Sequence, residues 1–183
     1  DDAIAWISSH GGQPWFVWAA FNAPHAPLHF PPNNLHSYDA AATTNRNQYE
    51  AMCEALDTEV GRLLAAVNPA TTNVIFIGDN GTPQNVIQPP YNAAHSKETL
   101  YDGGTRVPLI IAGPAVVGPN RESFVPVNCV DLYSTILELA GINVAATRPI
   151  RNSWNSCGIA SLSSRTSLPS TRSMPSSTPM IAT

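Results

Sequence analysis

The chain has 183 residues, enough for one domain with a buried core, and its formal net charge is -4. Residues 1–145 hold all 13 acidic residues but only five of the nine basic ones. The body therefore lacks the basic patch typical of nucleic-acid binding, and no apolar run is long enough to cross a bilayer. The three cysteines, Cys53, Cys129 and Cys157, lack the spacing of a disulfide framework or a zinc site. The compartment and the oligomeric state stay open.

The chain opens with a predicted helix that begins after Asp1 and Asp2, two acids that favour a helix N-terminus as caps. Its apolar positions share one helical face, and the Gly pair at 11–12 ends it. The aromatic and apolar run at 15–21 then predicts a buried strand.

Polar chemistry follows that strand in Asn22-Ala23-Pro24-His25-Ala26-Pro27. Prolines near His25 on both sides restrict the backbone to extended conformations and give the imidazole a fixed place. A fixed His can act as a proton donor near neutral pH, so His25 is a candidate catalytic residue. The alternative is a surface residue of a Pro-rich loop.

A long helix is predicted from about residue 45 to residue 67. Six apolar side chains recur at spacings of three and four, and Asn68-Pro69 stops the pattern; they are Met52, Leu56, Val60, Leu63, Leu64 and Val67. We expect this helix to support a sheet and to carry no chemistry.

The central predicted strand is Val-Ile-Phe-Ile at 74–77, four apolar residues typical of a strand buried on both faces of a parallel sheet. Asp79 and Asn80 follow at its carboxyl end, where open α/β sheets place their sites. Their oxygens suit a hard cation such as Ca²⁺ or Mg²⁺. A plain turn is the alternative for Asp-Asn-Gly, and Asn80-Gly81-Thr82 also matches the glycosylation pattern. We favour the metal ligand.

The loop after this strand holds Lys97, the only lysine of the chain. A lone ammonium beside a suspected site is a candidate anion-binding group, and a surface cation is the alternative. Further along, the sequence predicts a strand at 107–112, a short edge strand at 124–127 and a helix at 131–141.

Four motifs in this order resemble the later part of an arylsulfatase-type sulfatase of the alkaline phosphatase superfamily. They are Asn22–Pro27, the run at 75–81, the run from Lys97 to Pro108, and the helix from Val130 to Gly141. The resemblance implies an α/β fold, part of a mostly parallel sheet flanked by helices, that is incomplete here. We expect a partial sulfatase-like domain at 1–145 and an irregular Ser/Thr/Pro-rich tail at 146–183.

The resemblance also implies roles. Asp79 and Asn80 match half of the family's Ca²⁺ site, His25 matches its active-site His, and Lys97 matches the Lys that contacts the sulfate of a sulfate ester substrate. The family's nucleophile is a formylglycine made from Cys or Ser, and its motif does not occur before Asn22. We therefore expect a fragment of a sulfuric ester hydrolase that is inactive alone. The alternatives are a phosphodiester or phosphonate-ester hydrolase of the same superfamily, and a non-catalytic metal-binding remnant.

Overall fold

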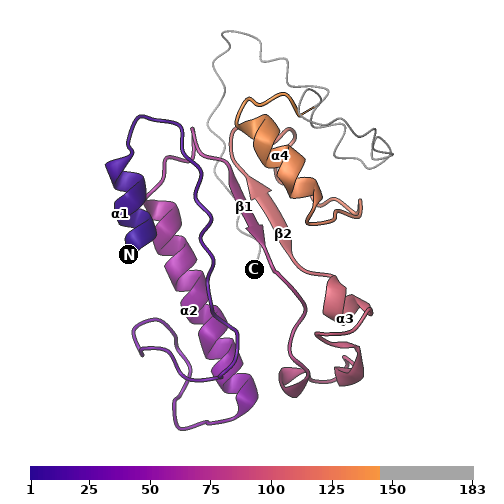
Figure 1. The fold of residues 1–183 in the computed structure, drawn as a ribbon. Coiled ribbons are helices and arrows are strands. Elements are labelled where there is room, and N and C mark those ends of the chain that lie inside the picture. The colour runs from indigo at the N-terminus through magenta and orange to yellow at the C-terminus, as the bar shows by residue number, and fades with distance from the viewer. Residues whose placement is uncertain (145–183) are drawn as a thin grey trace. The chain divides into compact units, whose positions relative to one another are not determined.

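The computed structural model of the protein describes residues 1–144, so the tail predicted at 146–183 lies outside the described residues. The chain divides into two compact units, one from Asp1 to Ile111 and one that begins at Ala112. Figure 1 shows the elements in chain order: α1 (Asp2–Ser9), α2 (Asn45–Ala65), β1 (Val74–Ile77), η1 (Gln84–Val86), η2 (Ala93–His95), α3 (Asp102–Thr105), β2 (Leu109–Ala112) and α4 (Asp131–Leu139). The mixture of helices and strands agrees with the predicted α/β class.

Helix α2 is the longest element and carries most of the core of the first unit. The Thr44 side chain caps its start by accepting from the Asn47 backbone N–H at 3.1 Å. Met52 is buried, together with Ala51 and Ala55. The other five members of the predicted apolar stripe are only half-buried; they are Leu56, Val60, Leu63, Leu64 and Val67. The helix is therefore where the sequence predicts it, with much of its apolar face only partly covered.

The two strands form a two-stranded sheet, β1 beside β2. The Gly78 N–H donates to Pro108 O at 3.1 Å, and the Gly81 N–H donates to Gly104 O at 3.0 Å. As the residue number of the donor rises from 78 to 81, that of the acceptor falls from 108 to 104. The strands are therefore antiparallel, as their arrows show in Figure 1. The predicted parallel pairing is not what these two strands make, and β1 is half-buried rather than buried on both faces.

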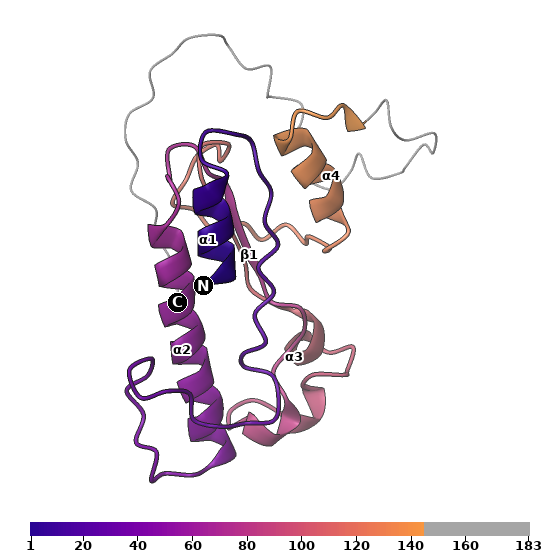
Figure 2. The same ribbon diagram turned by 60° about the vertical axis from the view of Figure 1, so that its left-hand side comes forward.

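The predicted strand at 15–21 is an extended segment without strand assignment. Figure 1 and Figure 2 show it running beside β1 and in the same direction. No backbone hydrogen-bond ladder pairs it within the described chain, and Trp18 remains 72% exposed. The edge strand predicted at 124–127 is likewise unpaired there, with Phe124 85% exposed. An apolar run makes a strand only when a neighbour satisfies its backbone, which explains both differences.

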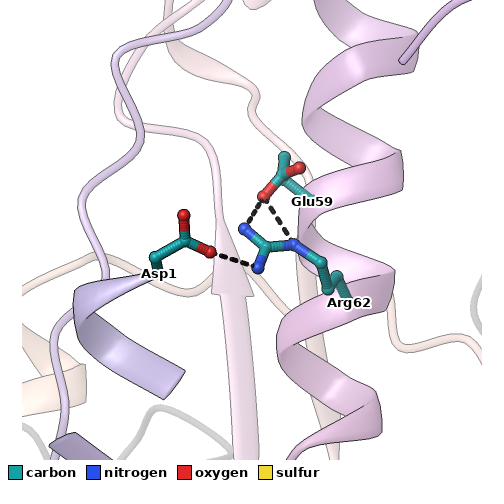
Figure 3. A network of polar contacts seen from close by, with 3 residues as sticks. All are labelled: Asp1, Glu59 and Arg62. Carbon is teal, nitrogen blue, oxygen red and sulfur yellow. Dashed lines mark hydrogen bonds and ion pairs between the residues drawn. The ribbon is translucent and has the colours of Figure 1, made fainter. Parts of the chain in front are cut away.

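Helix α1 lies next to the C-terminal half of α2 (Figure 2). Asp1 occupies the N-cap position, but its side chain makes no capping hydrogen bond. It pairs instead with Arg62 of α2, at 2.6 Å from Oδ1 to Nη1, and Arg62 also binds Glu59 (Figure 3). The predicted helix start with Asp1 at the N-cap is therefore confirmed, but the Asp1 carboxylate binds the Arg62 guanidinium instead of a backbone N–H.

We expect Arg62→Ala to lower the free energy of unfolding by less than about 1 kcal/mol. The Asp1 side chain is 90% exposed and that of Arg62 is 45% exposed, so water and salt screen both ion pairs. Urea denaturation at low and high salt checks this. A loss that is much larger and independent of salt would mean that the Arg62 stem supports α1 by packing.

The second unit contains α4, which ends at Leu139, just before the predicted glycine stop at Gly141. Gly141 has a left-handed φ of 76°, its N–H donates to Glu138 O at 2.9 Å, and the Ile142 N–H donates to Leu137 O at 2.9 Å. These two bonds form a Schellman motif. Across residues 1–144, no helix combines the length and the apolar character that a bilayer crossing needs.

Candidate functional site

Asp79 and Asn80 stand directly after β1, at the carboxyl end that the sequence predicts. Both are exposed, and the Asn80 Nδ2 donates to the Asp79 Oδ1 at 2.5 Å. The amide thus meets the carboxylate through its nitrogen, so Asp79 Oδ2 and the Asn80 carbonyl oxygen remain for a ligand. Two neighbouring side chains present oxygen donors at one point of the surface.

The loop that carries Lys97 is bonded to the segment that follows Asn80. Gly81 N–H donates to Gly104 O at 3.0 Å, and the Lys97 N–H donates to Thr82 O at 2.9 Å. The first bond joins the two ends of the loop, and the second holds its middle. The lysine is therefore attached three residues after Asp79, although the sequence separates the two by 18 positions.

Three glycines allow this close approach of backbone to backbone. A Cβ on Gly81 would lie 1.9 Å from Gly103 O, and one on Gly104 would lie 2.2 Å from Thr99 O. A Cβ on Gly103 would lie 2.3 Å from His95 O. Real Cβ atoms cannot come so near a carbonyl oxygen, so any side chain at these positions would push the two segments apart.

Helix α2 supports the same loop from the other side. Arg46 donates from Nη1 to Val86 O of η1 at 3.1 Å, and Val86 is 1% exposed. Burial raises the pKa of the Tyr49 phenol, which is hydrogen-bonded to Thr82. Burial also raises the pKa of the Cys53 thiol, whose sulfur is hydrogen-bonded to Tyr49. The Arg46 and Tyr49 side chains therefore connect α2 to the segment at 82–86, whose Thr82 bonds Lys97.

We expect stability to fall as the pH rises above about 9 to 10, because Tyr49 and Cys53 keep their protons longer in the folded chain. Their raised pKa values favour folding fully below the unfolded-state values, and this contribution is lost as the pH passes the folded-state values. Urea denaturation between about pH 8 and pH 10.5 measures it. The Tyr49→Phe variant should lose less stability over this range. An equal loss in both proteins would contradict the assignment.

His25 closes a turn in which its backbone N–H donates to Asn22 O at 2.8 Å, after a cis peptide bond to Pro24. Its side chain is exposed, and Nδ1 lies 2.8 Å from Ala26 O. Because a carbonyl oxygen only accepts, Nδ1 carries a proton and Nε2 is the ring atom left for chemistry. Within residues 1–144, no hydrogen bond or ion pair joins His25 to Asp79, Asn80 or Lys97, so its place in the site remains a prediction.

Within residues 1–144, no three His, Cys, Asp or Glu side chains gather as a metal site would require. Ca²⁺ takes six to eight oxygens, of which Asp79 and Asn80 could supply only a part. Their donor chemistry fits a hard cation, and further ligands would have to come from elsewhere. Lys97 is half-buried and forms no ion pair in the described part of the chain. Its ammonium is therefore not committed to a carboxylate there.

Sequence reasoning missed the glycines as site residues, and it missed the ring pair of His95 and Tyr101. The two rings stack with centroids 3.6 Å apart. The Gly103-Gly104 pair was a usable signal, because adjacent glycines often mark a close backbone approach. Nothing in the spacing of His95 and Tyr101 indicates that their rings meet.

The chain resembles known sulfatases over most of its described length. The sulfatase family profile matches residues 1–142. A sulfatase of Formosa agariphila is 31% identical in an alignment that covers 81% of this chain and 30% of the relative. Arylsulfatase K of Xenopus laevis is 25% identical over 79% of this chain and 36% of its own length. The N-acetylgalactosamine-6-sulfatase of Canis lupus familiaris is 28% identical over 75% of this chain and 27% of its own length.

The chain thus spans only about a third of the length of these curated relatives. The match nevertheless includes all four motifs that carry the resemblance in the sequence, since the last of them ends at Gly141. The family profile also covers well over half of the chain, from its first residue through α4. The chain therefore belongs to the sulfatase family.

Proposed function

We propose that this chain supplies part of the active site of a sulfuric ester hydrolase. In this proposal, Asp79 and Asn80 are ligands of a Ca²⁺ ion, Lys97 binds a sulfuryl oxygen, and His25 serves the leaving oxygen. The observation that carries it is the pair of backbone bonds that fixes the Lys97 loop against the segment after Asn80. Those bonds bring the Lys97 backbone to the segment that directly follows the two oxygen donors, which supports a shared site.

The charges suit this chemistry. Transfer of a sulfuryl group builds negative charge on its oxygens and on the leaving alcohol oxygen, and preorganised positive groups stabilise that charge. Bound Ca²⁺ would supply part of this stabilisation, and a formylglycine from the family's Cys or Ser motif would supply the nucleophilic oxygen. Lys97 offers a compact ammonium. His25 offers Nε2, which donates to the leaving oxygen when it too is protonated.

Binding by the protein itself tests the proposal apart from turnover. Because Lys97 is the only lysine, isotopic labelling of lysine gives one set of side-chain NMR signals. We expect sodium sulfate, but not sodium chloride at equal ionic strength, to shift these signals saturably, and more strongly with Ca²⁺ present. A response to phosphate in place of sulfate would favour the phosphodiester or phosphonate-ester alternative. Ca²⁺ binding without any anion response would favour the non-catalytic alternative.

We expect Asp79→Asn to weaken Ca²⁺ binding about tenfold or more, because it removes the only charged donor of the pair. Isothermal titration with Ca²⁺ measures the affinity. Asp102→Asn is the matched control, since its side chain is 89% exposed and its contact with Arg106 spans 3.9 Å. Equal Ca²⁺ affinity in the two variants would remove Asp79 from the metal site.

A further inference from the structure

We propose that the stacked rings of His95 and Tyr101 act as a positioning pair that holds the Lys97 ammonium in place for sulfate. The inference rests on the proposed function, because it assigns the pair a role through Lys97. The ring centroids lie 3.6 Å apart, and the ring planes are 16° from parallel. His95 ends η2 and Tyr101 precedes α3, so the two rings meet across the turn that carries the lysine.

The turn itself is tight. Thr99 donates to Ser96 O twice, from its backbone N–H at 3.2 Å and from Oγ1 at 2.7 Å. Lys97 and Glu98 are the two central residues, and Glu98 has a left-handed φ of 72°. Ser96 is 2% exposed, so the first residue of the turn is buried. The Lys97 backbone is thus fixed by the turn and by its bond to Thr82.

The other end of the turn has backbone bonds but little side-chain packing: Tyr101 O accepts from the Gly104 N–H at 2.8 Å and from the Thr105 N–H at 3.1 Å. Leu100 is 97% exposed, and Tyr101 is 55% exposed, so neither is held by a core. The contact of the Tyr101 ring with His95 connects this end of the turn to η2, and the backbone of His95 in turn lies close to Gly103. Without the ring contact, only the bonds of Thr99 to Ser96 and those accepted by Tyr101 O would hold this segment, and we expect the ammonium to occupy a wider range of positions.

An ordered ammonium binds an anion more tightly than a mobile one, because less conformational freedom is lost on binding. Near-parallel ring stacking has a specific geometry that an aliphatic side chain does not reproduce. We therefore expect Tyr101→Ala and Tyr101→Leu to weaken sulfate binding about three- to tenfold, whereas Tyr101→Phe keeps the wild-type affinity within about twofold. The phenol hydroxyl is not needed for this role.

The test uses the whole chain labelled at its single lysine. Sodium sulfate is titrated into the wild type and the three Tyr101 variants, and the affinity is read from the Lys97 side-chain signals. Relaxation of the Lys97 backbone amide, measured without sulfate, reports its mobility directly. Leu100→Ala is the control, because it removes an exposed neighbour without touching either ring. The melting temperature of each variant separates loss of the fold from loss of position.

The proposal holds if Tyr101→Leu, still folded, shows weaker sulfate binding and a more mobile Lys97 amide, and if Tyr101→Phe restores both. It is overturned if the folded Tyr101→Leu protein matches the wild type in amide mobility and affinity, or if Tyr101→Phe is as impaired as Tyr101→Leu. If the wild-type lysine does not respond to sulfate, the proposed function fails, while amide relaxation still decides whether the ring pair positions Lys97.

Discussion

Gly81→Ala is expected to lower the free energy of unfolding by about 2 to 4 kcal/mol and to detach the Lys97 loop from β1. The new Cβ would lie 1.9 Å from Gly103 O and 2.7 Å from Gly104 Cα, and both are backbone atoms. No rotamer change can relieve such a clash. The segments must separate, which also breaks the bond from Gly81 N–H to Gly104 O. Urea denaturation gives the loss, and the amide shifts of residues 96–104 show where it occurs.

Gly61→Ala is the matched control, because the same added methyl group meets nothing within 4 Å at that position of α2. Alanine favours the helical state over glycine, so this variant should be more stable by about 0.4 to 1 kcal/mol. Opposite signs for the two variants would localise the effect to the contact between Gly81 and Gly103. If Gly81→Ala were as stable as the wild type, the close approach of the two segments would be wrong.

The helices and strands with strong local patterns could be predicted from the sequence. Apolar spacing and a capping Thr44 define α2, and a glycine with positive φ ends α4. The runs at β1 and β2 are short, apolar and bounded by glycine or proline. These signals lie within a few residues of the element itself, so they can be recognised without knowing which other elements pack against it.

The direction of pairing could not be predicted in the same way. Four apolar residues fit a strand in a parallel or an antiparallel sheet, and only the path from Gly78 back to Pro108 decides between them. The segment at 15–21 has an equally strong apolar pattern but lacks strand assignment in the described structure. A strand depends on backbone partners that come from other parts of the sequence, and its own residues do not reveal them.

The candidate site likewise combines a feature set by local sequence with one set by a distant backbone partner. The place of Asp79 and Asn80 after β1 follows from chain order alone. The attachment of Lys97 to Thr82 does not, because it is a bond between two backbone groups that any residue types could make. The turn at His25 is local and is closed by its backbone bond to Asn22 O, whereas the position of His25 relative to Lys97 remains a prediction.

Lys97→Ala is expected to weaken sulfate binding about 10- to 100-fold, the effect of losing one charge-assisted hydrogen bond. The variant should stay folded, because the Lys97 backbone N–H still donates to Thr82 O and Ser96 still closes the turn. Isothermal titration with sodium sulfate, with and without Ca²⁺, measures the affinity. Lys97→Arg is the informative companion: it keeps the positive charge but replaces a compact ammonium with a planar fork.

The Arg variant separates two explanations of any loss. If charge alone attracts sulfate to this surface, Lys97→Arg binds as well as the wild type, and both affinities fall steeply with added salt. The bonds of the loop to Thr82 and Ser96 fix the Lys97 backbone. If the ammonium is likewise held at one point, Lys97→Arg recovers only part of the affinity. Arg106→Ala is the control for general charge, since its side chain is 78% exposed. A sulfate affinity unchanged in Lys97→Ala would exclude this lysine from the anion site.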